Sequence, residues 1–168
     1  MLTERQIETF ETDGVLVVED LLPPDLLTRI RSEYVALLDG LYAAWAAEGR
    51  VPPSDVPPSD VQPSDGLGFW DKLLTAYRAG CDWFQPMDIS LPGGAIAPDT
   101  PFHFGPAVFD MLTCPRLLDL VEDLIGPEIV SNPIQHVRLK PPAATLHADE
   151  IRAHVGGTDW HQDRAVAL

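Results

Sequence analysis

Cysteine, basic side chains and long apolar runs are all scarce in this chain of 168 residues. Its two cysteines are too few for a disulfide scaffold and lack the spacing of a zinc motif, which favours a reducing, cytoplasmic compartment. Eleven Lys and Arg face 26 Asp and Glu, and the net charge of −15 repels phosphate backbones and anionic lipids. No apolar run approaches the roughly 18 residues of a membrane span. We therefore expect neither a nucleic acid nor a membrane as partner.

The remaining composition is that of a globular protein. Hydrophobic residues make up 45% of the chain and charged residues 22%, so the chain is able to build a buried core and we expect a globular protein instead of a wholly disordered one. The length is typical of one domain, which we expect to span residues 1–168.

Four segments have the pattern of amphipathic helices. The first opens with the capping box of Thr3 and Gln6 and ends at Gly14. Large aromatic residues at helical spacing in the later segments, Trp45, Trp70 and Tyr77, are expected in the core. The four helices are expected over residues 3–14, 24–48, 70–80 and 115–126.

Two segments have the composition of strands. Residues 15–18 are a run of Val and Leu that predicts one buried strand. Residues 128–140 are also strand-like, and Pro133 indicates a sheet edge or a bulge near the start.

Residues 51–66 contain three Pro-Ser-Asp tripeptides at a period of five. Proline excludes a helix there, and so few polar residues cannot bury a solenoid core, so we expect an exposed insertion or linker. Residues 82–104 are rich in Pro and Gly and predict a long loop, which in a compact domain is either functional or hides an element.

His161 and Asp163 form the strongest candidate for a metal site. On a strand, residues two apart leave the same face about 7 Å apart at Cα, so that a metal ion fits between them. One imidazole and one carboxylate are two of the three ligands in the 2-His-1-carboxylate triad of non-haem Fe(II) oxygenases. The alternative without a metal site is that His161 and Asp163 are surface residues on an edge strand.

The preceding strand-like segment has one basic face. Counting by twos places His136, Arg138 and Lys140 on one side and Val137 and Leu139 on the other. In a chain of net charge −15, such a face suits an anionic co-substrate, although a solvated outer face has the same pattern.

Several motifs together carry a resemblance to a known family. They occur in the order Phe10 to Leu22, Leu124-Ile125-Gly126-Pro127, Leu139-Lys140-Pro141-Pro142 and Trp160-His161-Gln162-Asp163. In this order they resemble the N-terminal half of phytanoyl-CoA dioxygenase family proteins, which are Fe(II)/2-oxoglutarate-dependent oxygenases. The Trp-His-Gln-Asp string after Lys-Pro-Pro is the most specific piece.

The resemblance implies site residues and an activity. His161 and Asp163 match the first two iron ligands of the family, and His136, Arg138 and Lys140 are nominated as contacts of the co-substrate 2-oxoglutarate or the substrate. The implied reaction uses Fe(II), 2-oxoglutarate and O₂ to hydroxylate a small organic substrate. Retention of Asp163 favours hydroxylation over the halogenation performed by relatives that lack the carboxylate.

The resemblance also implies a fold. We expect an α+β chain in which helices pack on the first strands of a double-stranded β-helix, or jelly roll. The family places a distal His ligand and an Arg for 2-oxoglutarate on later strands, so we expect Leu168 to be a truncation point. Unpaired strand edges would then favour self-association.

Two other readings remain open. His147, His154 and His161 recur at intervals of seven, which suggests a zinc or copper site on an unbroken helix, although Gly156 and Gly157 interrupt it. The second is a catalytically inactive relative whose helical part acts as an interaction module.

Overall fold

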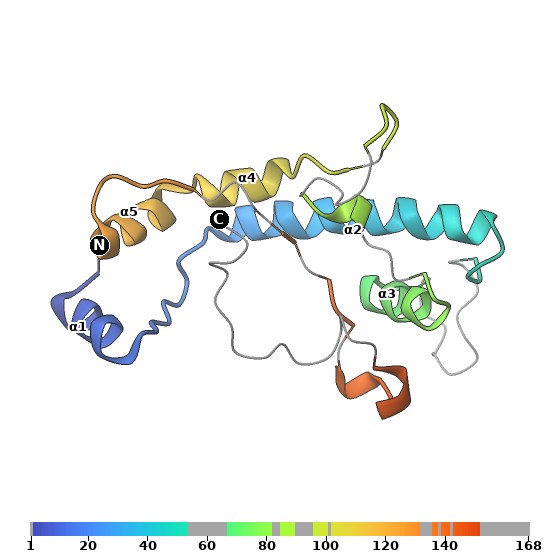
Figure 1. The fold of residues 1–168 in the computed structure, drawn as a ribbon, viewed down its shortest axis with the longest axis horizontal. Coiled ribbons are helices and arrows are strands. Elements are labelled where there is room, and N and C mark those ends of the chain that lie inside the picture. Colours follow the sequence, from blue (N-terminus) through green and yellow to red (C-terminus); the bar gives the residue numbers. More distant parts are fainter. Residues whose placement is uncertain are drawn as a thin grey trace. The chain divides into compact units, whose positions relative to one another are not determined.

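A computed structural model describes residues 2–53, 67–81, 85–89, 96–100, 102–131, 136–137, 139–141 and 143–151. Within these ranges the regular structure is helical (Figure 1). The α-helices are α1 (Glu4–Asp13), α2 (Pro24–Ala47), α3 (Phe69–Arg78), α4 (Pro106–Leu112) and α5 (Pro115–Ile125). Three short 3-10 helices are η1 (Gln85–Met87), η2 (Ala143–Thr145) and η3 (Ala148–Glu150). None of the described helices is both long and apolar enough to cross a membrane.

The chain divides into two compact units. The first comprises residues 1–33 and 104–133, and the second comprises residues 34–103 and 134–168. Helix α2 contributes its first ten residues to one unit and the rest to the other.

Helix α1 forms as its sequence predicts. Thr3 is the N-cap, and its side chain and that of Gln6 complete the capping box. The helix ends where Gly14 adopts a left-handed conformation with φ of 72° and donates its N–H to the Phe10 carbonyl. In the same unit the backbone N–H of Leu2 donates to the Asp123 carboxylate of α5, which ties the two helices together (Figure 1).

Helix α4 is not among the predicted helices. Its seven residues are too few for a periodic pattern to stand out, but Gly105 and Pro106 mark its start. Glu33 of α2 accepts a hydrogen bond from the Ala107 N–H at 2.9 Å, which satisfies a donor that the first turn of a helix leaves open. An ion pair between Arg29 and Asp110 joins the same two helices.

The core of the second unit gathers around the C-terminal half of α2. Tyr42 and Trp45 pack there with residues from the connection between α2 and α3, from α3 itself and from the position just after α3. The other members of this cluster are Val51, Leu67, Ala76 and Cys81. The predicted burial of Trp45 and Tyr77 is confirmed, whereas that of Trp70 is wrong, because Trp70 is 56% exposed and its ring meets only the edge of Phe69 among the described rings.

The predicted buried strand over residues 15–18 is wrong. These residues are not a strand, and Val17 is 80% exposed. A strand is defined by a partner that takes its backbone hydrogen bonds, and the described residues supply none. Apolar, β-branched composition is therefore found in a link between α1 and α2 in which Val15 and Val17 are exposed and Leu16 and Val18 are partly buried.

The expected α+β jelly roll is likewise contradicted, because no strand occurs in the described part of the chain. Of the strand-like segment 128–140, the described residues are 128–131, 136–137 and 139–140, and none is in a strand. At Val137 the backbone N–H bonds to the Asp88 carboxylate, so a side chain takes the place of a neighbouring strand. Most of the Pro-Ser-Asp insertion lies outside the described residues.

Candidate functional site

Asp88 organises the predicted loop of residues 82–104. It follows η1 and is only 8% exposed. One carboxylate oxygen, Oδ1, accepts the Val137 N–H at 2.8 Å, and the other, Oδ2, lies 2.8 Å from Nδ1 of His136. The Asp88 backbone oxygen also accepts the His103 N–H at 3.4 Å. The described part of this loop is therefore anchored at a buried carboxylate in its first half.

His136 is the partner of Asp88 whose ring is able to contact a ligand. An ionised carboxylate only accepts hydrogen bonds, so an ionised Asp88 requires the proton of the imidazole to be on Nδ1. The second ring nitrogen, Nε2, is then the atom able to act on a ligand. The two side chains differ in exposure: that of His136 is 37% exposed and that of Asp88 is 11% exposed.

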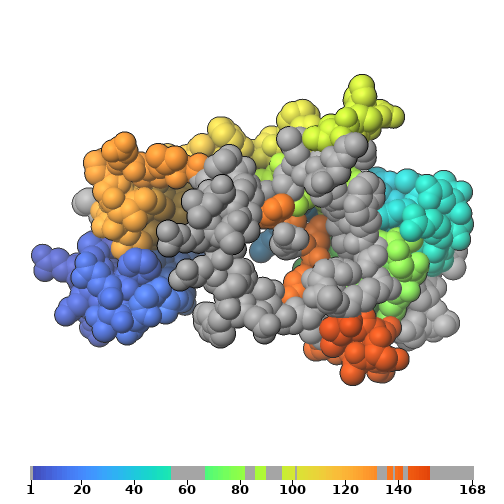
Figure 2. All heavy atoms as spheres, viewed as in Figure 1, coloured from blue at the N-terminus to red at the C-terminus, as the bar shows by residue number. Residues whose placement is uncertain are grey.

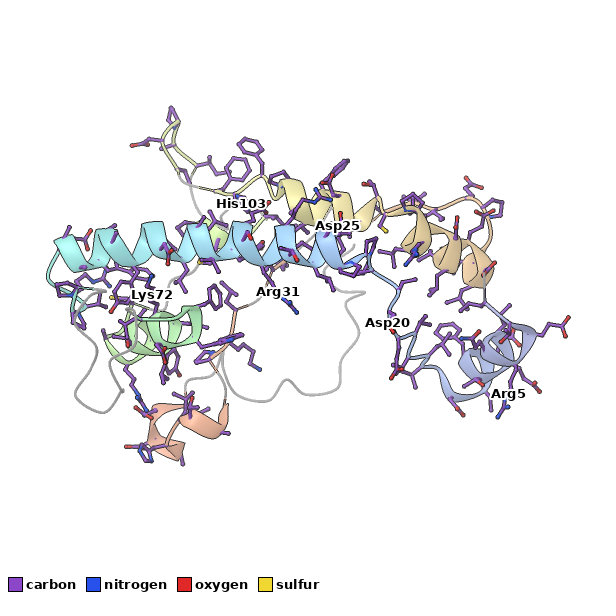
Figure 3. The ribbon with its side chains drawn as sticks, turned by 180° about the vertical axis from the view of Figure 1, so that it is seen from behind. Arg5, Asp20, Asp25, Arg31, Lys72 and His103 are labelled. Atoms are coloured by element: carbon purple, nitrogen blue, oxygen red, sulfur yellow. The ribbon has the colours of Figure 1, made fainter. Side chains whose placement is uncertain are left out.

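His103 and Tyr34 lie near the same loop. Their rings meet edge to face, with centroids 5.9 Å apart and planes at 87°. Tyr34 comes from α2, and Figure 3 labels His103 on the segment that leads to α4. This contact links the end of the loop to the helix that carries much of the core of the unit.

A second set of contacts fixes the segment that leads toward the predicted iron ligands. The Tyr77 hydroxyl donates to the Glu150 backbone oxygen at 2.6 Å, and Arg78 Nε donates to the Glu150 carboxylate at 2.9 Å. Arg78 also donates to the Thr145 carbonyl. Helix α3 thus contacts η2 and η3, which lie in the same unit and are drawn in orange-red in Figure 2.

Glu150 has a lowered pKa. The causes, in order, are the hydrogen bond from the His147 backbone N–H and the one from Arg78, and both favour the ionised carboxylate. The pKa of Tyr42, by contrast, is raised because burial disfavours the charged phenolate.

The structure reaches only part of the predicted site. His161, Asp163 and Arg138 lie outside the described residues, and so does His154. His136 and Lys140 are described, and both are exposed, whereas Val137 and Leu139 are partly buried. The predicted alternation of a polar and an apolar side therefore holds at these four positions without a strand.

The described ranges contain no group of three or more His, Cys, Asp or Glu side chains able to hold a metal ion. His147, from the heptad-spaced series, is exposed at the start of η3, where its backbone N–H donates to Glu150. Both cysteines, Cys81 and Cys114, are buried free thiols.

Asp88 is absent from the predicted site residues. The available signal is an acidic residue between two apolar neighbours, Met87 and Ile89, in a loop where burial would otherwise be unexpected. A charge buried in such surroundings requires partners, which are supplied by residues almost fifty positions later.

No protein-family model, curated protein or solved structure matches the chain.

Proposed function

We propose that the chain belongs to the phytanoyl-CoA dioxygenase family and contributes two iron ligands, His161 and Asp163, to a non-haem Fe(II)/2-oxoglutarate-dependent dioxygenase. The observation that carries the proposal is the string Trp160-His161-Gln162-Asp163 placed after Lys140-Pro141-Pro142. One imidazole and one carboxylate separated by a single residue are the donor types that Fe(II) accepts in a facial triad. Its substrate is a small organic molecule.

The donor set fits Fe(II) better than a structural zinc ion. Structural zinc sites are closed by four ligands, commonly cysteines, and both cysteines of this chain are buried. Two protein ligands of mixed type leave coordination positions for a co-substrate, which a catalytic iron site requires. A bound iron would supply activation of O₂ with 2-oxoglutarate as the electron donor.

The described residues would serve this chemistry by holding the co-substrate. His136 and Lys140 are exposed on the polar side of one segment, and both are able to contact a carboxylate. In a chain of net charge −15, a local basic group offsets the general repulsion of an anion. The contacts of Tyr77 and Arg78 fix the chain eleven positions before His161.

Turnover of 2-oxoglutarate tests the proposed activity. In a protein that also carries the distal His ligand and the Arg for 2-oxoglutarate, we expect succinate to form with Fe(II) and O₂, and we expect His161→Ala and Asp163→Ala to reduce the rate of its formation at least a hundredfold. His147→Ala is the matched control, because His147 is a histidine of the same region that the proposal gives no ligand role. Equal succinate formation by His161→Ala and the unmodified protein would refute the assignment.

A second candidate function is an interaction module without catalysis. It is favoured by one observation, the exposed apolar link between α1 and α2, where Val15 and Val17 face solvent. Exposed apolar side chains of this kind are able to pack against another chain.

A further inference from the structure

We propose that Asp88 is the positioning residue of His136, which it holds so that Nε2 contacts a carboxylate group of the ligand. This inference rests on the proposed function, because the carboxylate meant is that of 2-oxoglutarate. The hydrogen bonds between Asp88 and His136 do not depend on the identity of that ligand.

Asp88 is itself fixed on three sides. Its two carboxylate oxygens are taken by the Val137 N–H and His136 Nδ1, both at 2.8 Å, and its backbone oxygen accepts the His103 N–H. A buried carboxylate is costly unless it is paired and hydrogen-bonded, so these partners explain why the charge is tolerated at 8% exposure. The carboxylate therefore has little freedom to turn away from the imidazole.

This anchoring determines which ring nitrogen carries the first proton. The ionised carboxylate accepts from Nδ1, so Nε2 has a lone pair in the neutral ring. A carboxylate accepts a hydrogen bond from the ring only through an N–H, so the ring that binds it carries a proton on Nε2 as well, and the resulting bond is charge-assisted.

The exposures of the two side chains agree with a ligand that binds to His136 and not to Asp88. The Asp88 carboxylate is buried and the His136 imidazole is partly exposed, so a ligand in solvent is able to reach the imidazole. Histidines that bind ligands or metals are commonly oriented in this way, by a carboxylate on the other ring nitrogen. Asp88 does not itself touch the ligand and acts only through His136.

The ring proton provides the first test and needs no metal or activity. In ¹⁵N-labelled full-length protein, long-range ¹H–¹⁵N spectra should show a protonated Nδ1 on His136. In Asp88→Asn the amide oxygen can keep the Val137 bond while the amide NH₂ faces Nδ1, so the ring proton should move to Nε2. Asp149→Asn, an exposed change, should leave it in place. An Nδ1 without a proton in the unmodified protein, or no change in Asp88→Asn, would overturn the positioning role.

Binding of 2-oxoglutarate provides the second test. With Fe(II) under anaerobic conditions, His136→Gln should weaken its binding about tenfold, the scale of one charge-assisted hydrogen bond, and Asp88→Asn should weaken it less, because its neutral ring keeps an Nε2–H donor. The double variant should be no weaker than His136→Gln, because Asp88 acts through that ring. Additive losses would show a role for Asp88 apart from His136 and would overturn the proposal.

The two tests separate this proposal from the proposed function. If the ring proton switches as expected but the unmodified protein does not bind 2-oxoglutarate, the positioning role stands and the dioxygenase assignment, with the ligand named here, is refuted. If 2-oxoglutarate binds and the ring proton does not switch, the assignment stands and the positioning role fails. The Val137 amide signal reports whether Asp88→Asn keeps the local fold.

Discussion

The hydroxyl of Tyr77 donates a hydrogen bond to the backbone oxygen of Glu150 over 2.6 Å. This contact joins α3 to residues more than seventy positions later in the chain. Together with the bonds from Arg78, it makes the end of α3 the support for the segment that precedes the predicted iron ligands.

Two buried tyrosines are predicted to respond in opposite ways to the same substitution. Tyr77→Phe should lower the free energy of unfolding by about 1 kcal/mol or more, because it leaves the Glu150 carbonyl without its donor. Tyr42→Phe should be neutral or stabilising by up to about 1 kcal/mol, since the Tyr42 hydroxyl is buried without a hydrogen bond in the described part of the chain. Urea denaturation of both variants measures the difference, and equal losses would contradict it.

Acid should release the segment that contains Glu150. Because the pKa of this carboxyl is lowered in the folded chain, ionisation stabilises the fold above the ordinary value for Glu, about 4.3. The stabilisation is lost as the pH falls through the lowered pKa.

The backbone amide of His147 reports this titration directly, because its N–H donates to Glu150 Oε2 at 2.8 Å. Its NMR chemical shift should therefore change with a midpoint below the usual Glu range, and the change should be absent in Glu150→Gln. A midpoint at or above the usual value would show that these bonds do not favour the ionised form.

The two tryptophans of the amphipathic segments are predicted to differ in their importance for stability. Trp45→Ala removes a side chain from the core cluster and should cost about 3–5 kcal/mol. Trp70→Ala removes an exposed ring that contacts Phe69 and should cost about 1 kcal/mol. Thermal or urea unfolding of both variants measures the loss of unfolding free energy. A larger loss for Trp70→Ala than for Trp45→Ala would contradict the exposure of Trp70.

The helices were predictable where the signal is local. The capping box of Thr3 and Gln6 and the left-handed Gly14 lie within one helix, so the sequence alone places α1. In α2 the helical spacing correctly predicts the burial of Trp45, which the structure buries together with Leu38 and Tyr42.

The failures come from partners that are distant in the sequence. Residues 15–18 have the composition of a strand, but a strand depends on pairing that composition does not encode. Asp88 could not be paired with His136 for the same reason, because no local pattern relates a loop carboxylate to a ring almost fifty positions later. Trp70 fits a helical stripe, yet its exposure depends on whether another element covers that face.

The exposed link between α1 and α2 predicts self-association. If Val15 and Val17 mediate contacts between copies, Val17→Lys should shift the protein toward monomer in sedimentation velocity at micromolar concentration. Val35→Lys, which replaces an exposed valine on α2, is the matched control and should leave the distribution unchanged. A monodisperse monomer before any substitution would refute the prediction and remove the support for an interaction module.

The most direct measurement of the central claim is an anaerobic titration of the protein with Fe(II), followed by calorimetry, for the unmodified chain and for His161→Ala, Asp163→Ala and His147→Ala. For a protein in which the distal His ligand completes the set, we predict one iron site that is lost or weakened at least tenfold in the first two variants and kept in the third. Iron binding that survives His161→Ala and is lost in His147→Ala would contradict the account.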